Sequence, residues 1–140
     1  MTGRSDWRLV GAMLLCLLCG VVGCSGPAGP ANGSVRFDDG TPVTSGSIEF
    51  RNRKSRQLYA SRLTSEGAFQ LADKEGRLGL PPGAYEVVVV QVILTEDLAK
   101  ESHTHGQTVP RRFNDYYTTD LAMQISENQP EPLELIVPVE

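Results

Sequence analysis

Cysteine, aromatic residues and positive charge are all scarce in this chain of 140 residues. Its three cysteines, Cys16, Cys19 and Cys24, all precede residue 25, so the rest of the chain has none for a disulfide or a cysteine-ligated metal. Aromatic residues make up 6% of the chain, and 13 Lys and Arg against 17 Asp and Glu give a formal net charge of −4. Nucleic acid is therefore not an expected partner, because binding phosphates requires a cationic surface.

Turn-forming residues are abundant, with 14 Gly and 9 Pro. This composition favours a turn-rich chain over a helical bundle. A chain of this length normally forms one domain.

Long hydrophobic runs are also absent. The longest run, residues 9–23, follows Arg4 and Arg8 and has about 15 residues, whereas a membrane-spanning helix needs about 20. This pattern is typical of a signal-peptide core. A buried helix of the domain is disfavoured, because no polar face interrupts the run. The Gly- and Pro-rich residues that follow suit a flexible tether.

The run ends in Val21-Val22-Gly23-Cys24. These residues resemble the lipobox of bacterial lipoproteins, in which an apolar residue, a small or aliphatic residue and Gly or Ala precede Cys. The resemblance implies signal cleavage between Gly23 and Cys24, and a thioether lipid on Cys24. Membrane lipid is then a partner, because two or more acyl chains give stable anchoring. The alternative is an ordinary secretory signal that leaves Cys24 as a free thiol.

From residue 33 onward, short apolar runs alternate with turn signals. Ile48 and Phe50 alternate with polar neighbours, as in a half-buried strand, and residues 87–90 are consecutive valines, which favour a central strand. The runs cover residues 34–37, 46–50, 58–63, 68–71, 84–93, 121–125 and 133–139. Runs separated by turns every 8 to 12 residues or so predict an all-β, seven-stranded antiparallel Greek-key β-sandwich. The expected organisation is a signal peptide (1–23), a lipidated Cys with a flexible tether (24–32) and one domain (33–140).

Four segments of this domain occur in a family-like order: GSVRFDDGTPV from residue 33, GSIEF from 46, TSEGAFQL from 64 and LPPGAYEVVV from 80. They resemble the carboxypeptidase regulatory-like family, whose domains are transthyretin-like or Ig-like sandwiches. The resemblance covers residues 33–139 and implies an extracytoplasmic accessory domain. Independently, Gly83 permits a turn with positive φ after two prolines, and Tyr85 is expected to pack on the core with its hydroxyl on a backbone group.

The most aromatic and basic patch lies in the long loop of residues 94–118. Arg111, Arg112, Tyr116 and Tyr117 could grip a carboxylate or stack on a sugar ring, which would make the chain a carbohydrate- or peptide-binding module. The competing interpretation is a strand edge with Phe113 tucked into the core. The basic run of residues 51–56 is interpreted as a solvated hairpin tip, with contact to an acidic envelope polymer as the alternative.

A second alternative is a metal-dependent hydrolase around His103 and His105. These histidines are two positions apart, so on an extended segment their side chains would point to the same side. They could then share a metal if a third ligand were near. The competing interpretation is two solvated loop histidines. The sequence contains no Gly-x-Ser-x-Gly elbow, phosphate loop or dinucleotide motif. The leading prediction is a non-catalytic structural or binding module at the cell envelope, without a cofactor, whose partner is an envelope protein or polysaccharide.

Overall fold

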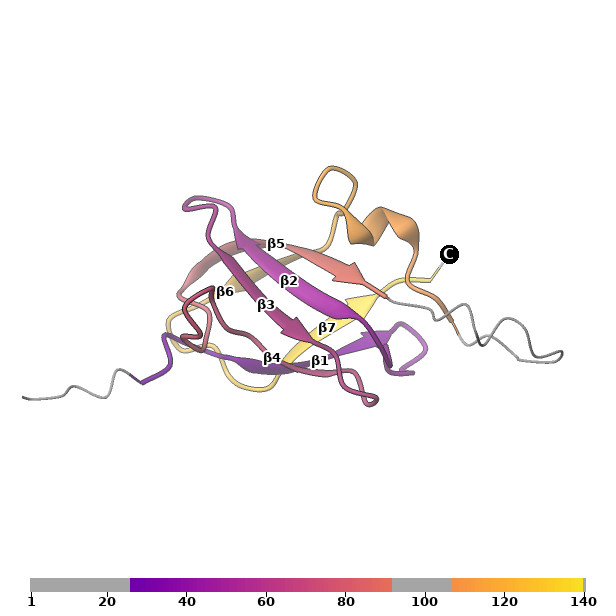
Figure 1. Ribbon diagram of the computed structural model, residues 1–140, viewed down its shortest axis with the longest axis horizontal. Coiled ribbons are helices and arrows are strands. Elements are labelled where there is room, and N and C mark those ends of the chain that lie inside the picture. The colour runs from indigo at the N-terminus through magenta and orange to yellow at the C-terminus, as the bar shows by residue number, and fades with distance from the viewer. Residues whose placement is uncertain (1–25, 92–106, 140) are drawn as a thin grey trace, which may run out of the picture.

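The computed structural model describes residues 26–91 and 107–139. Within these residues, strands dominate and form two sheets (Figure 1). The strands are β1 (Asn32–Phe37), β2 (Ser47–Asn52), β3 (Leu58–Arg62), β4 (Ala68–Gln70), β5 (Gly83–Val90), β6 (Ala122–Ile125) and β7 (Leu133–Val137). A short 3₁₀ helix, η2 (Arg111–Asn114), lies between β5 and β6 in the chain. The predicted all-β class is confirmed.

One sheet has the strand order β4-β1-β7, and the other has the order β3-β2-β5-β6. Every neighbouring pair in the second sheet is antiparallel, and so is the pair of β1 with β4. The prediction of an antiparallel arrangement throughout is wrong for β1 and β7, which are parallel.

The path of the chain explains the parallel pair. Ile125, at the end of β6, lies opposite Gly83, and the following loop crosses to the other sheet. β7 then begins at Leu133 opposite Gly33, near the start of β1. Because both strands start at the same end, they run in the same direction. Parallel neighbours need a long connection, and most of the domain separates these two strands in sequence.

The hydrophobic core contains side chains from both sheets. Ile48 and Phe50 are fully buried, as the alternation along β2 predicts. In β5, Val87 and Val89 belong to this core, but Val88 points to the opposite face and is still only 4% exposed. Its burial follows from its place on a central strand against which η2 packs. The valine run is thus a central strand, as predicted.

Tyr85 anchors an aromatic cluster in this core. Its ring centroid lies 6.2 Å from that of Phe50 and 6.0 Å from that of Tyr59, both in edge-on geometry. Its hydroxyl donates a hydrogen bond to the backbone oxygen of Pro81 at 2.6 Å. Gly83 has φ of +153°. The expected roles of Gly83 and Tyr85 are confirmed.

The chain before β1 differs from the expected flexible tether. The Ala28 amide donates to Leu78 O at 3.0 Å, and the oxygens of Pro30 and Ala31 accept from backbone amides at 2.9 and 2.8 Å. Pro30 and Ala31 are buried. Residues 28–32, here called the docked segment, are therefore part of the domain. The physical reason is that Pro30 and Ala31 have apolar side chains, which favour burial. Their backbone oxygens can be buried at little cost, because backbone amides of the domain donate hydrogen bonds to them.

The expected strand limits differ from the observed ones by at most three residues. β5 ends at Val90, and residues 92 and 93 of the predicted strand lie outside the described residues. β7 ends at Val137, because the next residue, Pro138, has no N–H to donate to a ladder.

Candidate functional site

Tyr116, one of the four predicted ligand contacts, lies across the outer face of the four-stranded sheet. Its hydroxyl donates to Glu49 Oε1 at 2.7 Å, and the Arg51 guanidinium carbon stands 3.6 Å from its ring centroid. Burial and the hydrogen bond to Glu49 raise the pKa of the Tyr116 hydroxyl, so it remains a donor at neutral pH. Its polar and aromatic groups thus already have partners within the domain.

Arg51 is held in place by the neighbouring strand. Its Nη2 lies 2.7 Å from Glu86 Oε2, and its Nε donates to the same oxygen at 3.0 Å. The hydrogen bond from Arg51 lowers the pKa of Glu86. These cross-strand partners follow from the register, in which Arg51 is opposite Glu86. The sequence prediction missed the stack of Arg51 on Tyr116, because the residues are far apart in sequence and Arg51 was assigned to a solvated hairpin.

The other predicted contacts do not gather around Tyr116. Arg111 and Arg112 lie in η2, and the Arg112 guanidinium carbon is 4.5 Å from the Phe113 ring centroid. Phe113 is fully buried, so its predicted place in the core is confirmed, although in a 3₁₀ helix and not at a strand edge. Tyr117 is 97% exposed. Beside Tyr116 there is a cavity of about 240 Å³, whose charged lining residues are the acidic Glu49 and Asp115.

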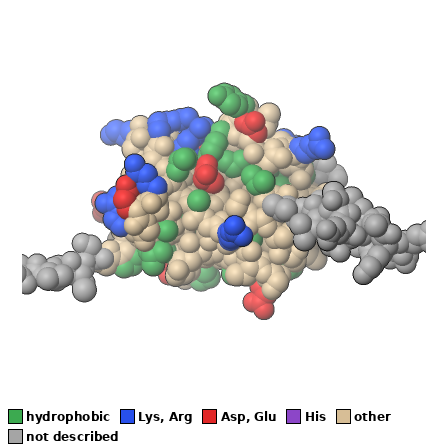
Figure 2. Space-filling model, in the orientation of Figure 1, with side chains coloured by type: hydrophobic (Ala, Val, Ile, Leu, Met, Phe, Trp, Pro, Cys, Tyr) green, Lys and Arg blue, Asp and Glu red, His purple; other side chains and the backbone are tan. Residues whose placement is uncertain are grey.

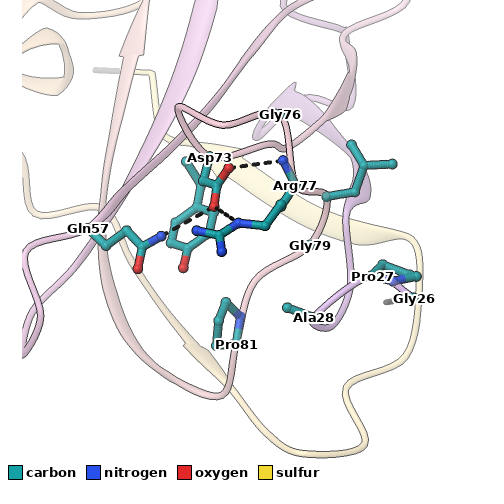
Figure 3. Close-up of a pocket in the computed structure, with 11 residues that line it drawn as sticks. Gly26, Pro27, Ala28, Gln57, Asp73, Gly76, Arg77, Gly79 and Pro81 are labelled. Carbon is teal, nitrogen blue, oxygen red and sulfur yellow. Dashed lines mark hydrogen bonds and ion pairs between the residues drawn. The ribbon is translucent and has the colours of Figure 1, made fainter. Parts of the chain in front are cut away.

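A larger cavity, of about 660 Å³, opens at the end of the domain where the described chain begins (Figure 3). Three separate segments line it: the residues around Ala28, the start of β3, and the turn before β5. The lining residues are Gly26, Pro27, Ala28, Gln57, Tyr59, Asp73, Gly76, Arg77, Leu78, Gly79 and Pro81. We call it the N-terminal cavity.

Asp73 organises one wall of the N-terminal cavity. Its side chain is 3% exposed, and it accepts hydrogen bonds from the backbone amides of Glu75 and Arg77 at 3.0 and 2.9 Å. Its other oxygen accepts from Arg77 Nε at 2.8 Å and from Gln57 Nε2 at 3.5 Å. Burial would raise the pKa of Asp73, but the hydrogen bonds donated to it outweigh burial and hold that pKa below its usual range. The buried carboxylate thus fixes Arg77 and Gln57 at the cavity (Figure 3).

Two polar groups of this cavity have no partner among the described residues. Tyr59 is 5% exposed and lines the cavity, yet its hydroxyl makes no hydrogen bond within residues 26–91 and 107–139. Arg77, whose side chain is 70% exposed, uses Nε and Nη2 for Asp73 and Glu75 and leaves Nη1 unbonded within the same residues. Burial raises the pKa of Tyr59, so its hydroxyl is a donor at neutral pH. The cavity therefore offers two donors to a hydrogen-bond acceptor, beside the apolar groups of Leu78 and Pro81.

No local signal in the sequence identifies the N-terminal cavity. Tyr59 and Arg77 lie in an ordinary strand and an ordinary turn, and Ala28 lies in a segment expected to be a tether. Backbone bridges from Ala72 to Ala60 and to Leu78 bring the strand of Tyr59 beside the turn of Arg77, and the docking of Ala28 on Leu78 adds the third segment.

Several predicted site residues lie outside the described residues: Gly23 and Cys24 of the lipidation motif, and His103 and His105 of the candidate metal site. Among residues 26–91 and 107–139, no group of three or more His, Cys, Asp or Glu side chains could hold a metal ion. In the same part of the chain, no helix has the length and apolar character needed to span a membrane.

Comparisons of this chain with protein-family models, with curated proteins and with solved structures found no match.

Proposed function

We propose that this chain is a membrane-anchored lipoprotein whose β-sandwich is a non-catalytic binding module on the extracytoplasmic side of the cell envelope. The motif Val21-Val22-Gly23-Cys24, behind a short apolar run and a weakly positive head, supports the anchor. The described domain begins close behind this motif. Its anchor partner is membrane lipid, bound through acyl chains on Cys24.

The finer fold class is part of this proposal. A Greek-key sandwich of the transthyretin-like, carboxypeptidase regulatory-like type agrees with the two sheets and with the order of the four sequence motifs. Domains of this architecture present binding sites on loops and strand ends, because a rigid pair of sheets holds those positions fixed.

The N-terminal cavity carries the binding part of the proposal. The single decisive observation is a buried tyrosine, Tyr59, that lines a cavity of about 660 Å³ and whose hydroxyl has no hydrogen-bond partner among the described residues. Tyr59 and Arg77 offer donors, and Leu78 and Pro81 offer apolar contact. This combination suits a short peptide with a free carboxylate, because the carboxylate is an acceptor and small side chains fit the apolar wall.

The anchor is tested by mass spectrometry of the chain extracted from membranes. We expect an N-terminus at Cys24 that carries acyl and thioether-linked glyceride groups. The Cys24→Ser variant should lose the modification and leave the membrane fraction. An unmodified thiol at Cys24 in the wild-type chain would contradict the proposal.

The cavity is tested by titration of the purified chain with tri-alanine, followed by its melting temperature. Tri-alanine should raise the melting temperature, whereas its C-terminal amide and N-acetylglucosamine should raise it less. Tyr59→Phe removes one hydrogen bond and should weaken the affinity about 5-fold, which corresponds to about 1 kcal/mol. Tyr117→Phe, at an exposed tyrosine outside the cavity, is the matched control. Equal affinities for both variants would exclude Tyr59 from the site.

A further inference from the structure

The hairpin between β2 and β3 carries a concentration of positive charge in an otherwise acidic chain. Arg53, Lys54 and Arg56, here called the basic tip, are all exposed. Within the described residues, Arg53 and Lys54 form no ion pair, and Arg56 contacts Glu86 at 3.5 Å. Figure 2 shows Lys and Arg side chains gathered over this hairpin.

The basic tip lies at the end of the domain where the described chain begins (Figure 1). Gln57, which directly follows the tip, lines the N-terminal cavity together with Gly26, Pro27 and Ala28. The Ala28 amide is fixed to the domain by its hydrogen bond to Leu78 O. Four residue steps separate Ala28 from Cys24, and they span at most about 14 Å. A lipid on Cys24 therefore holds this end of the domain close to the membrane surface.

Some acidic residues of this end are already paired with cations: Glu86 contacts Arg51 and Arg56, and Glu75 contacts Lys74 and Arg77. Two further acidic residues lie apart from the tip. Glu127 and Glu131 belong to the loop between β6 and β7, which crosses to the other sheet. Glu131 accepts hydrogen bonds there from the amides of Ala31 and Asn32. Arg53 and Lys54 of the basic tip, at the four-stranded sheet, thus lie apart from the carboxylates of that loop. An anionic surface would attract the tip and repel the loop, which favours one tilt of the domain.

We propose that the basic tip contacts the anionic lipid headgroups of the membrane that holds the chain, so that the domain sits with its β2–β3 hairpin against the bilayer. This inference rests on the proposed lipid anchor at Cys24. The charges need to lie within about 8 Å of the headgroups at physiological ionic strength to act, and the short reach from Cys24 allows this.

The orientation is tested with the chain purified from membranes and reconstituted into vesicles. Ser55→Cys places a fluorescent label on the basic tip, and Ser65→Cys places one in the turn after β3, at its opposite end. The vesicles contain phosphatidylcholine with or without phosphatidylglycerol, and a headgroup-attached quencher measures proximity. We expect stronger quenching at residue 55 than at residue 65 in the phosphatidylglycerol vesicles, and loss of this contrast at high salt.

Variants that remove positive charge test whether the basic tip causes the difference in quenching between the two labels. Arg53→Gln with Lys54→Gln should abolish the contrast between the two labels. The matched control, Arg62→Gln with Arg111→Gln, removes two exposed cations outside the tip and should retain the contrast. Equal quenching of the two labels in phosphatidylglycerol vesicles, or the same contrast without phosphatidylglycerol, overturns the orientation and leaves the anchor intact. A chain that does not enter vesicles at all overturns the anchor, and the orientation with it.

Discussion

The four tyrosines of the chain occupy four different environments. Tyr85 is fully buried and bonded to backbone, and Tyr116 is held between Glu49 and a stacked guanidinium. Tyr59 is buried and lines the N-terminal cavity, and its hydroxyl has no hydrogen-bond partner among the described residues, whereas Tyr117 is almost fully exposed. At the scale of the residue, a tyrosine is therefore a candidate ligand contact when its hydroxyl has no partner in the described domain, and a structural residue when its hydroxyl is already bonded there.

Tyr85→Phe should lower the free energy of unfolding by about 1 to 2 kcal/mol, because the partly buried Pro81 oxygen loses its 2.6 Å hydrogen bond while the ring packing stays. Denaturant unfolding measures the change. Tyr117→Phe is the control, and its midpoint should equal that of the wild type. A Tyr85→Phe variant as stable as the wild type would show that the hydroxyl contributes nothing to the fold.

At the scale of the element, the loop between β6 and β7 holds the start of β1. Glu131 accepts hydrogen bonds from the amides of Ala31 and Asn32, and from Asn32 Nδ2 at 3.2 Å. These bonds, those from the backbone first, lower the pKa of Glu131 from its ordinary value of 4.5. The Glu131 carboxylate thereby links the docked segment to the loop that connects β6 to β7.

Glu131→Gln should change how stability depends on pH. A carboxylate with a lowered pKa in the folded state stabilises the fold above its ordinary pKa, and this contribution is lost as pH falls through the lower folded-state value. The wild type should therefore lose stability as pH falls below 4.5, and Glu131→Gln should be less stable at neutral pH with a smaller acid loss. Melting temperature across this pH range is the measurement. Glu134→Gln, at a carboxylate on β7 without a hydrogen bond among the described residues, should be as stable as the wild type at neutral pH, and an equal loss of stability there in both variants would contradict the role of Glu131.

At the scale of the whole molecule, the domain includes the docked segment. Ala28, Pro30 and Ala31 pair with the turn before β5 and with Leu71, so the chain entering from the N-terminus completes this end of the fold. Ala28 of the docked segment also lines the N-terminal cavity. The extent of the domain and its candidate site therefore depend on the same few residues, on which the proposed orientation at a membrane also rests.

A chain that starts at residue 33, the boundary predicted from sequence, should be less stable than one that starts at residue 26. The shorter chain loses the backbone bonds of Ala28, Pro30 and Ala31, which together correspond to about 3 kcal/mol. Thermal and denaturant unfolding of the two chains measure the difference. Equal stability would mean that the docked segment contributes nothing to the fold.

The strands of the fold were largely predictable because their signal is local. Alternation in β2, the valine run of β5 and the Gly83 turn each depend on neighbouring residues, and the structure has them near the expected positions. The candidate site was much less predictable. Tyr116 was identified as part of an aromatic patch, but its partners Glu49 and Arg51 come from β2, and no local pattern reports such a contact.

The sequence by itself determined that the domain is all-β, that Ile48 and Phe50 face its core, and which motif predicts a lipid anchor, because burial periodicity and short motifs are properties of neighbouring residues. Only the tertiary structure decided that β1 and β7 are parallel, that residues 28–32 are docked, and that Tyr59 and Arg77 meet at one cavity. These features arise between segments distant in the chain. Such contacts form where backbone and side-chain polar groups, brought together by the packing of the two sheets, find hydrogen-bond partners in a distant segment.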